Sequence, residues 1–290
     1  MGYKKISYRE IKKEQLEDLK KNVMNFHFYR YFSTPFTYIF VKLGISPNAI
    51  TISSFFLCLA GFYFLAKGTY LDILISMLFF VLFKTMDMSD GEVARIQNSP
   101  SIEGMYFDRI SHYIFSLSIG IGFGIGLTKL YNNEIYLLLG FIFALAFMLE
   151  FAMKDLLKFF LREAIIKIGK KGIQKLSMKE IDRIIWKKFT QGMYKGKSWE
   201  QGNFLSRLIG FYPFQGLIYI DTIVIPIFIV LIAIESYFAI AGREIIFYGY
   251  EISLVAFYVI IICISKLIWI SLFIYKIERY RHITNTLKEI

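Results

Sequence analysis

The feature that most constrains this chain is a series of long apolar blocks separated by charged segments. Each block has roughly the 17 to 25 residues that a helix needs to cross a lipid bilayer. With 56% hydrophobic and 20% charged residues, the chain is neither disordered nor an ordinary soluble domain. We therefore predict an all-α, polytopic membrane protein with six transmembrane helices, at about 49–66, 71–96, 104–127, 135–153, 216–234 and 252–275.

The segments around these blocks differ in character. Ser7 and Glu10 form a capping-box pattern, and an aromatic-rich basic stretch follows, which predicts an N-terminal amphipathic helix at the membrane interface. The expected parts are an N-terminal cytoplasmic or interfacial segment (1–48), four spans with the catalytic motif (49–153), a basic cytoplasmic insertion of net charge +9 (154–215), and two spans with a cytoplasmic tail (216–290).

Basic residues lie mostly on one side of the predicted spans. Of the 34 Lys and Arg residues, 28 fall in segments that alternate onto a single face of the membrane. Because basic flanking residues stay in the cytoplasm, both termini and the charged end of the second span are expected there. Basic charge beside spans more often serves topology and anionic lipid than nucleic acid, so no nucleic-acid partner is expected.

The residues that can carry chemistry gather where the second span ends and the third begins. Asp87 and Asp90 are three residues apart, and Asp108 and His112 are four apart, so each pair shares one helix face. The linker between the two helices is short, which makes them neighbours. Clustered carboxylates repel one another at the edge of a membrane unless cations neutralise them, and hard divalent cations prefer oxygen ligands. The pattern predicts a divalent-cation site.

Two small residues and an arginine accompany the carboxylates. Gly91 and Ala94 lie one helical turn apart and leave a groove into which a ligand can press. Arg95, next to this groove, has the geometry to bind a phosphate. A cation site, a groove and an arginine together indicate a phosphorylated nucleotide as substrate.

These residues carry a resemblance to a known family. The pattern Asp-x2-Asp-Gly-x2-Ala-Arg-x8-Gly-x3-Asp-x3, which starts at Asp87, resembles the signature of the CDP-alcohol phosphotransferase (CDP-alcohol phosphatidyltransferase) family. It departs only at the last position, where the family has Asp and this chain has His112. The start of the first span, Pro47-Asn48-x-x-Thr51, is also similar to the family. The resemblance covers roughly residues 45–128.

The resemblance implies an integral, multi-pass membrane enzyme, often a homodimer, with a cytoplasmic active site. It would transfer a phosphoalcohol group of phosphatidyl type from a CDP-linked alcohol donor to an acceptor hydroxyl on a lipid or a small polyol. CMP would leave, and the pathway would be phospholipid or membrane-glycan synthesis. By this analogy one or two Mg²⁺ or Mn²⁺ ions would be held by Asp87, Asp90 and Asp108, and substrate would contact Asn48, Gly91, Ala94, Arg95 and Gly104.

His112 stands where the family places its base. An imidazole takes a hydroxyl proton at neutral pH, so we favour His112 as the catalytic base, acting with Asp108. Two other interpretations remain. In the first, His112 is a metal ligand, or the lost negative charge leaves one tightly bound ion instead of two. In the second, the site is degraded and the chain is a non-catalytic relative.

Other polar and small residues lie inside the predicted spans. Asp221 either contacts a substrate or forms a structural ion pair with Lys266 or Lys84. The run from Gly120 to Gly126, with a glycine at every second position, predicts a close helix contact. The alternative function is a non-catalytic family relative, or a membrane transport or scaffold protein. The inverted repeats typical of transporters are not evident.

Overall fold

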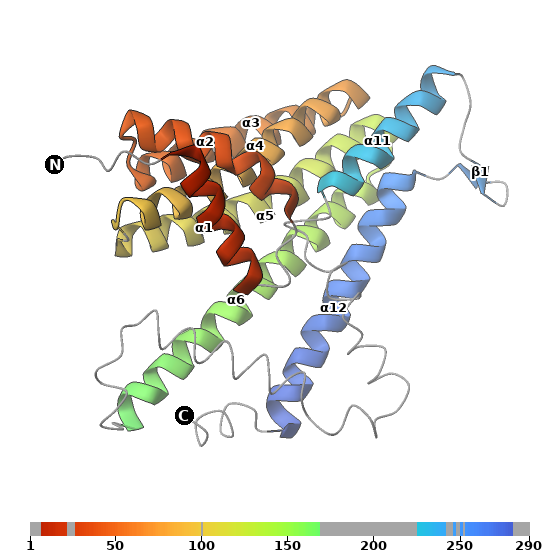
Figure 1. The fold of residues 1–290 in the computed structure, drawn as a ribbon. Coiled ribbons are helices and arrows are strands. Elements are labelled where there is room, and N and C mark those ends of the chain that lie inside the picture. The colour runs from red at the N-terminus through yellow and green to blue at the C-terminus, as the bar shows by residue number, and fades with distance from the viewer. Residues whose placement is uncertain are drawn as a thin grey trace. The chain divides into compact units, whose positions relative to one another are not determined.

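The structure is a computed structural model that describes residues 7–21, 27–99, 101–168, 225–241, 246–247, 250–251 and 253–280. These residues are almost entirely helical (Figure 1), as the composition predicts. The helices are α1 (Tyr8–Lys21), α2 (His27–Leu43), α3 (Pro47–Lys67), α4 (Tyr70–Ile96), α5 (Ile102–Tyr131), α6 (Ile135–Ile168), α11 (Ile225–Ile240) and α12 (Leu254–Tyr280). Two short strands, β1 (Ile246–Phe247) and β2 (Tyr250–Glu251), pair antiparallel.

The helices agree with the predicted spans to different degrees. The bounds of α3, α4 and α5 lie within a few residues of those predicted, whereas α6 continues through the expected membrane boundary at residue 153 to Ile168. Within the described residues, α3, α5 and the Ile135–Met153 part of α6 are long and apolar enough to cross a membrane, while α11 and the Leu254–Ile268 part of α12 are shorter apolar stretches.

The six-span count stays a prediction. Residues 169–224, which include most of the expected insertion and the start of the predicted fifth span, lie outside the described residues.

Contacts divide the chain into two compact units. The first comprises residues 1–145 and 219–262, and in it α3 packs along both α4 and α5 while α4 also packs against α2 and α11. The second comprises residues 146–218 and 263–290. In its described part a buried ion pair joins Glu150 to Lys266, whose ammonium lies 4.7 Å from the centre of the Phe147 ring.

The glycines of α5 let this helix approach two neighbours. A side chain at Gly120 would collide with Ala144, and Gly124 lies against Gly140, so this face packs closely on α6. Gly122 and Gly126 face Leu65 at the end of α3. Small residues four positions apart allow such backbone approach, and the helix contact predicted from the glycine run is confirmed.

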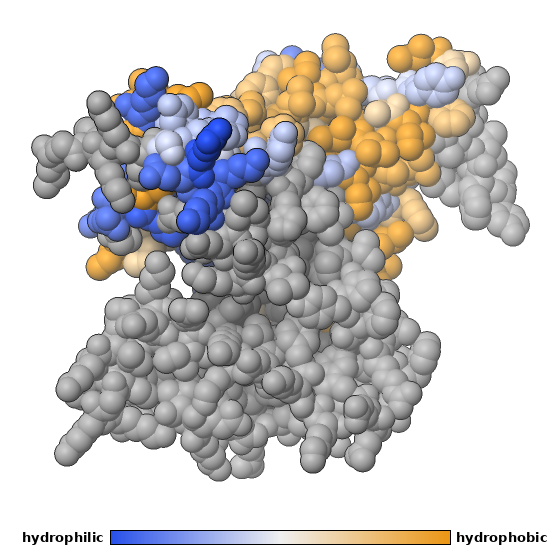
Figure 2. All heavy atoms as spheres, in the orientation of Figure 1, coloured by the Kyte–Doolittle hydropathy of each residue, from blue (hydrophilic) through white to orange (hydrophobic). Residues whose placement is uncertain are grey.

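The N-terminal helices attach to α4 through one buried carboxylate. Glu92 accepts hydrogen bonds from Gln15 Nε2 (2.7 Å), Thr37 Oγ1 (2.6 Å) and Ser33 Oγ (3.2 Å), which come from α1 and α2. The predicted capping box is also present, because Ser7 N donates to Glu10 Oε2 and Glu10 N donates to Ser7 Oγ. Figure 2 shows hydrophilic residues gathered around these N-terminal helices and hydrophobic ones over α3 and α11. The interfacial position of α1 and α2 stays a prediction.

Candidate functional site

The start of α3 is fixed by its first residues. Ser46 caps the helix in an extended conformation, with its hydroxyl accepting from Ala49 N, and Pro47 occupies the first turn, where its missing N–H costs nothing. Asn48 and Thr51, one turn apart, then lie on the same helix face. This local sequence places an amide and a hydroxyl beside the carboxylates of α4.

The turn between α4 and α5 brings the two halves of the motif together. Asn98 adopts the left-handed conformation with a φ of 50°, which ends α4 tightly. Ser101 then caps α5 by accepting a hydrogen bond from Gly104 N at 2.9 Å. Asp108 and His112 follow on the first turns of α5, close to Asp87 on the last turns of α4.

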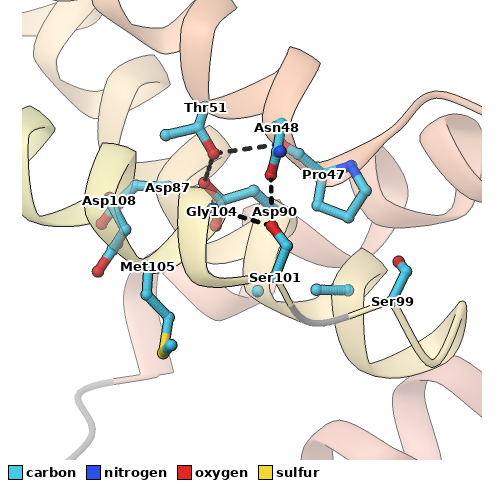
Figure 3. Close-up of a pocket in the computed structure, with 12 residues that line it drawn as sticks. Pro47, Asn48, Thr51, Asp87, Asp90, Ser99, Ser101, Gly104, Met105 and Asp108 are labelled. Atoms are coloured by element: carbon cyan, nitrogen blue, oxygen red, sulfur yellow. Dashed lines mark hydrogen bonds between the residues drawn. The ribbon is translucent and has the colours of Figure 1, made fainter.

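A cavity of about 250 Å³ lies where these three helix ends meet (Figure 3). Seven of the site residues predicted from sequence line it: Asn48, Asp87, Asp90, Gly91, Ala94, Gly104 and Asp108. Five further lining residues are Pro47, Thr51, Ser99, Ser101 and Met105. Residues that were predicted from the sequence to form one site therefore line a single cavity.

Polar contacts organise one corner of this cavity. Thr51 Oγ1 donates to Asp90 Oδ2 at 2.5 Å, and Ser101 Oγ donates to Asn48 Oδ1 at 3.4 Å. A Cβ placed on Gly104 would lie 2.9 Å from Asn48 Oδ1 and 3.1 Å from Ser101 Oγ, so a side chain at this position would displace one or both of these groups. Figure 3 shows the hydrogen-bonded set spread over α3, α4 and α5.

Carboxylates and an imidazole converge beside the cavity. Asp87, Asp108 and His112 each present one ligand-type atom, and the three atoms lie within 4.8 Å of one another. His112 Nε2 is 3.8 Å from Asp87 Oδ1 and 3.6 Å from Asp108 Oδ1. Asp108 is the more open carboxylate, with 39% of its side chain exposed against 12% for Asp87. His112 is 15% exposed and is not among the cavity-lining residues.

These residues fit a divalent cation. Asp87 Oδ1 is buried and accepts no hydrogen bond from the described residues, while Lys84 Nζ approaches the other oxygen, Oδ2, at 3.6 Å. A bound cation would stabilise the charge on Oδ1. Carboxylate oxygens are the ligands that Mg²⁺ and Mn²⁺ prefer. Asp90 lines the same cavity but does not belong to the set of three close ligand atoms, so its place as a ligand stays a prediction.

The remaining predicted residues lie at the edge of the site or outside the description. Arg95 is exposed, and its Nη1 would be 3.4 Å from a Cβ on Gly91, so the guanidinium lies against a cavity-lining residue. Asp221 lies outside the described residues. Lys266, one partner suggested for Asp221, pairs with Glu150.

Several polar residues of this region were not among the site residues predicted from the sequence. Ser101 had a usable signal, because a serine before an apolar stretch typically caps a helix. Thr51 belongs to the Pro47-Asn48-x-x-Thr51 pattern at the start of the first span. Its contact with Asp90 joins residues 39 positions apart, which local sequence does not reveal. Glu92 occupies a variable position of the motif, and nothing in the pattern distinguishes it from a solvent-facing residue.

An apolar helical protein with a carboxylate-lined cavity at its helix ends has the features of a membrane-embedded transferase of phosphorylated substrates. The family model for CDP-alcohol phosphatidyltransferase matches residues 44–184, a range that contains every residue lining the cavity. Residues 44–184 of the chain therefore match the CDP-alcohol phosphatidyltransferase family, and with its apolar helices the chain is an integral membrane protein. Compared with curated proteins and with solved structures, the chain has no significant match.

Proposed function

We propose that this protein is a divalent-cation-dependent transferase that moves a phosphoalcohol group from a CDP-linked donor to an acceptor hydroxyl and releases CMP. The observation that carries the proposal is the shared cavity, because seven of the predicted site residues, from three helices, line one space. Its mixture of carboxylates, small residues and an adjacent arginine suits a nucleoside diphosphate bound through cations and direct phosphate contacts.

In the proposed reaction the acceptor oxygen attacks the phosphorus that carries the alcohol. The bond from this phosphorus to the bridging oxygen breaks, and CMP departs with the electron pair. A bound divalent cation would neutralise charge on the diphosphate and on the leaving phosphate. Gly91 and Ala94 would leave room for the nucleotide, Arg95 would bind a phosphate from the rim, and Asn48 would lie near the cytidine.

The acceptor proton must go to a group that reaches the cavity. Asp108 lines the cavity and is partly exposed, whereas His112 lies beside it. Because a base must come within hydrogen-bond reach of the proton it takes, we propose Asp108 for this step. The base role favoured for His112 from the sequence stays a prediction.

The substrates divide into two classes that differ in which partner is the lipid. We propose a CDP-diacylglycerol donor with a small polar acceptor, in keeping with a phosphatidyl-type reaction in phospholipid synthesis. The opposite arrangement joins a soluble CDP-alcohol to a lipid acceptor. Cytoplasmic termini, a cytoplasmic active site and a homodimer belong to the same proposal and rest on charge pattern and family analogy.

The test is CMP release by purified protein in lipid nanodiscs, with Mn²⁺ or Mg²⁺, across CDP-diacylglycerol and soluble CDP-alcohols. Asp108→Asn should lower the rate by a factor on the order of 10² to 10⁴, because it removes both a charge at the cation site and the proposed base. Glu103→Gln, an equivalent change at an exposed position outside the cavity, should leave the rate unchanged. Equal rates in the two variants would overturn the proposal.

A further inference from the structure

Lys84 is a buried cation in contact with the carboxylate and imidazole cluster. It is 3% exposed, and its Nζ lies 3.2 Å from His112 Nδ1 and 3.6 Å from Asp87 Oδ2. The same atom lies 4.7 Å from the centre of the Phe115 ring and 5.3 Å from that of Phe83. A buried ammonium needs such partners, since removing it from water without them is strongly unfavourable.

The contact with Lys84 indicates which nitrogen of the His112 ring carries a hydrogen. An ammonium has only donors, so Nδ1 is the acceptor in this contact, and the tautomer that fits it has its hydrogen on Nε2. Nε2 is the nitrogen that faces Asp87 and Asp108. A nitrogen that carries a hydrogen has no lone pair to offer a metal ion, so this arrangement keeps the ring from acting as a ligand.

The charges of the cluster favour one bound ion over two. With all three ionised, the carboxylates of Asp87, Asp90 and Asp108 and the ammonium of Lys84 carry a total charge of −2, which one divalent cation balances. A cluster of four carboxylates without a lysine would carry a charge of −4, which two divalent cations would balance. Repulsion between cations in a partly buried site makes a second ion unfavourable here.

We propose that Lys84 and His112 together take the place of a second divalent cation, so that the cavity binds one Mg²⁺ or Mn²⁺ through carboxylates alone. This proposal rests on the proposed function, which supplies the reason to expect a bound cation. Because the proposal concerns how many cations bind, it is tested by measuring cation binding, without a CDP-linked donor and without measuring catalysis. Lys84 acts through His112 and Asp87 and is a positioning residue.

The first experiment counts Mn²⁺ bound to the purified protein in nanodiscs of zwitterionic lipid, by electron paramagnetic resonance of the free ion. Binding that persists in an Asp87→Asn/Asp108→Asn variant is subtracted. The native chain should bind one ion. The double variant Lys84→Met/His112→Asp, which restores a fourth carboxylate and removes the lysine, should bind two. Two ions in the native chain, none above the background, or one in the double variant would each overturn the proposal.

The second experiment detects nitrogen ligands directly, by the electron spin echo modulation that a coordinated ¹⁴N produces on bound Mn²⁺. The native chain should show no such modulation. Lys84→Met should show it, because the ring is then able to place its lone pair on Nε2, which lies within the set of close ligand atoms. The same variant should bind its ion more tightly, by about tenfold or more, since a cation beside Asp87 is gone.

Either departure from these results would overturn the proposal: ¹⁴N modulation in the native chain, or none in Lys84→Met. Methionine is suited to the aromatic surroundings of Lys84, and the native measurements need no variant to fold. A chain that binds one ion but releases no CMP from any donor would contradict the proposed function and leave the ion count intact.

Discussion

At the scale of single residues, the site depends on small side chains as much as on charged ones. Gly104 leaves the space in which Asn48 Oδ1 accepts a hydrogen bond from Ser101. The amide oxygen thereby has a hydrogen-bond partner in the cavity wall. A substrate contact made by Asn48 would lose its geometry if this space were filled, even with the rest of the helix unchanged.

Gly104→Ala should therefore weaken donor binding. The new Cβ would lie 2.9 Å from Asn48 Oδ1 and push the amide aside, so we expect the KM for the donor to rise about tenfold. The measurement is the KM from CMP release for Gly104→Ala, Asn48→Ala and the double variant. If the glycine acts through Asn48, the double variant should match Asn48→Ala; additive effects would contradict this link.

The grouping of the acidic residues was more predictable than their contacts. Helical spacing predicts that Asp87 and Asp90 share one helix face and that Asp108 and His112 share another, because residues three or four apart lie on the same face. The position of Lys84 against His112 was not predicted, since it depends on the packing of two helices that bring together residues 28 positions apart in the chain. Local periodicity carries no information on such a pairing.

At the scale of elements, α4 is held from two sides. Its Asp90 and Gly91 face the cavity, while Glu92 accepts hydrogen bonds from α1 and α2 on another side. Val41, Ile50 and Val93 form a small apolar core between α2, α3 and α4 beside these contacts. The N-terminal helices therefore support the last turns of α4, where the motif lies.

Glu92→Ala should loosen this attachment. It leaves the buried donors of Gln15, Ser33 and Thr37 without their shared acceptor, at a cost of about 1 to 3 kcal/mol for each polar group left unsatisfied. We expect a lower thermal unfolding midpoint than in the native protein. Glu103→Ala, at an exposed position, is the matched control. Equal midpoints in the two variants would show that the Glu92 network does not stabilise the protein.

The bounds of a helix were predicted better where capping residues mark its ends in the sequence. α3 is capped by Ser46 before Pro47 and by Gly68, which adopts a φ of 81°, after its last residue, and its predicted bounds were close. α6 passes the predicted membrane boundary because charged residues at the edge of a bilayer do not stop a helix. The glycine face of α5 was predicted, but its two partners come from packing.

At the scale of the whole molecule, the central claim is that this membrane protein, which matches the CDP-alcohol phosphatidyltransferase family over residues 44–184, catalyses transfer at this cavity. The family match over residues 44–184 and the apolar helices support this class of enzyme. Whether the chain transfers the group to an acceptor or only hydrolyses its donor depends on which molecule attacks the phosphorus. CMP release alone does not distinguish these two reactions.

The most direct measurement follows CMP and the acceptor-linked phosphate together, in nanodiscs supplied with Mn²⁺, a CDP-linked donor labelled in its alcohol, and an acceptor. We expect one labelled product for each CMP, with both lost in Asp108→Asn and after chelation of the cation, and both retained in Glu103→Gln. CMP without labelled product would indicate hydrolysis, and no CMP with any donor would indicate a non-catalytic relative. Either result would contradict the assignment.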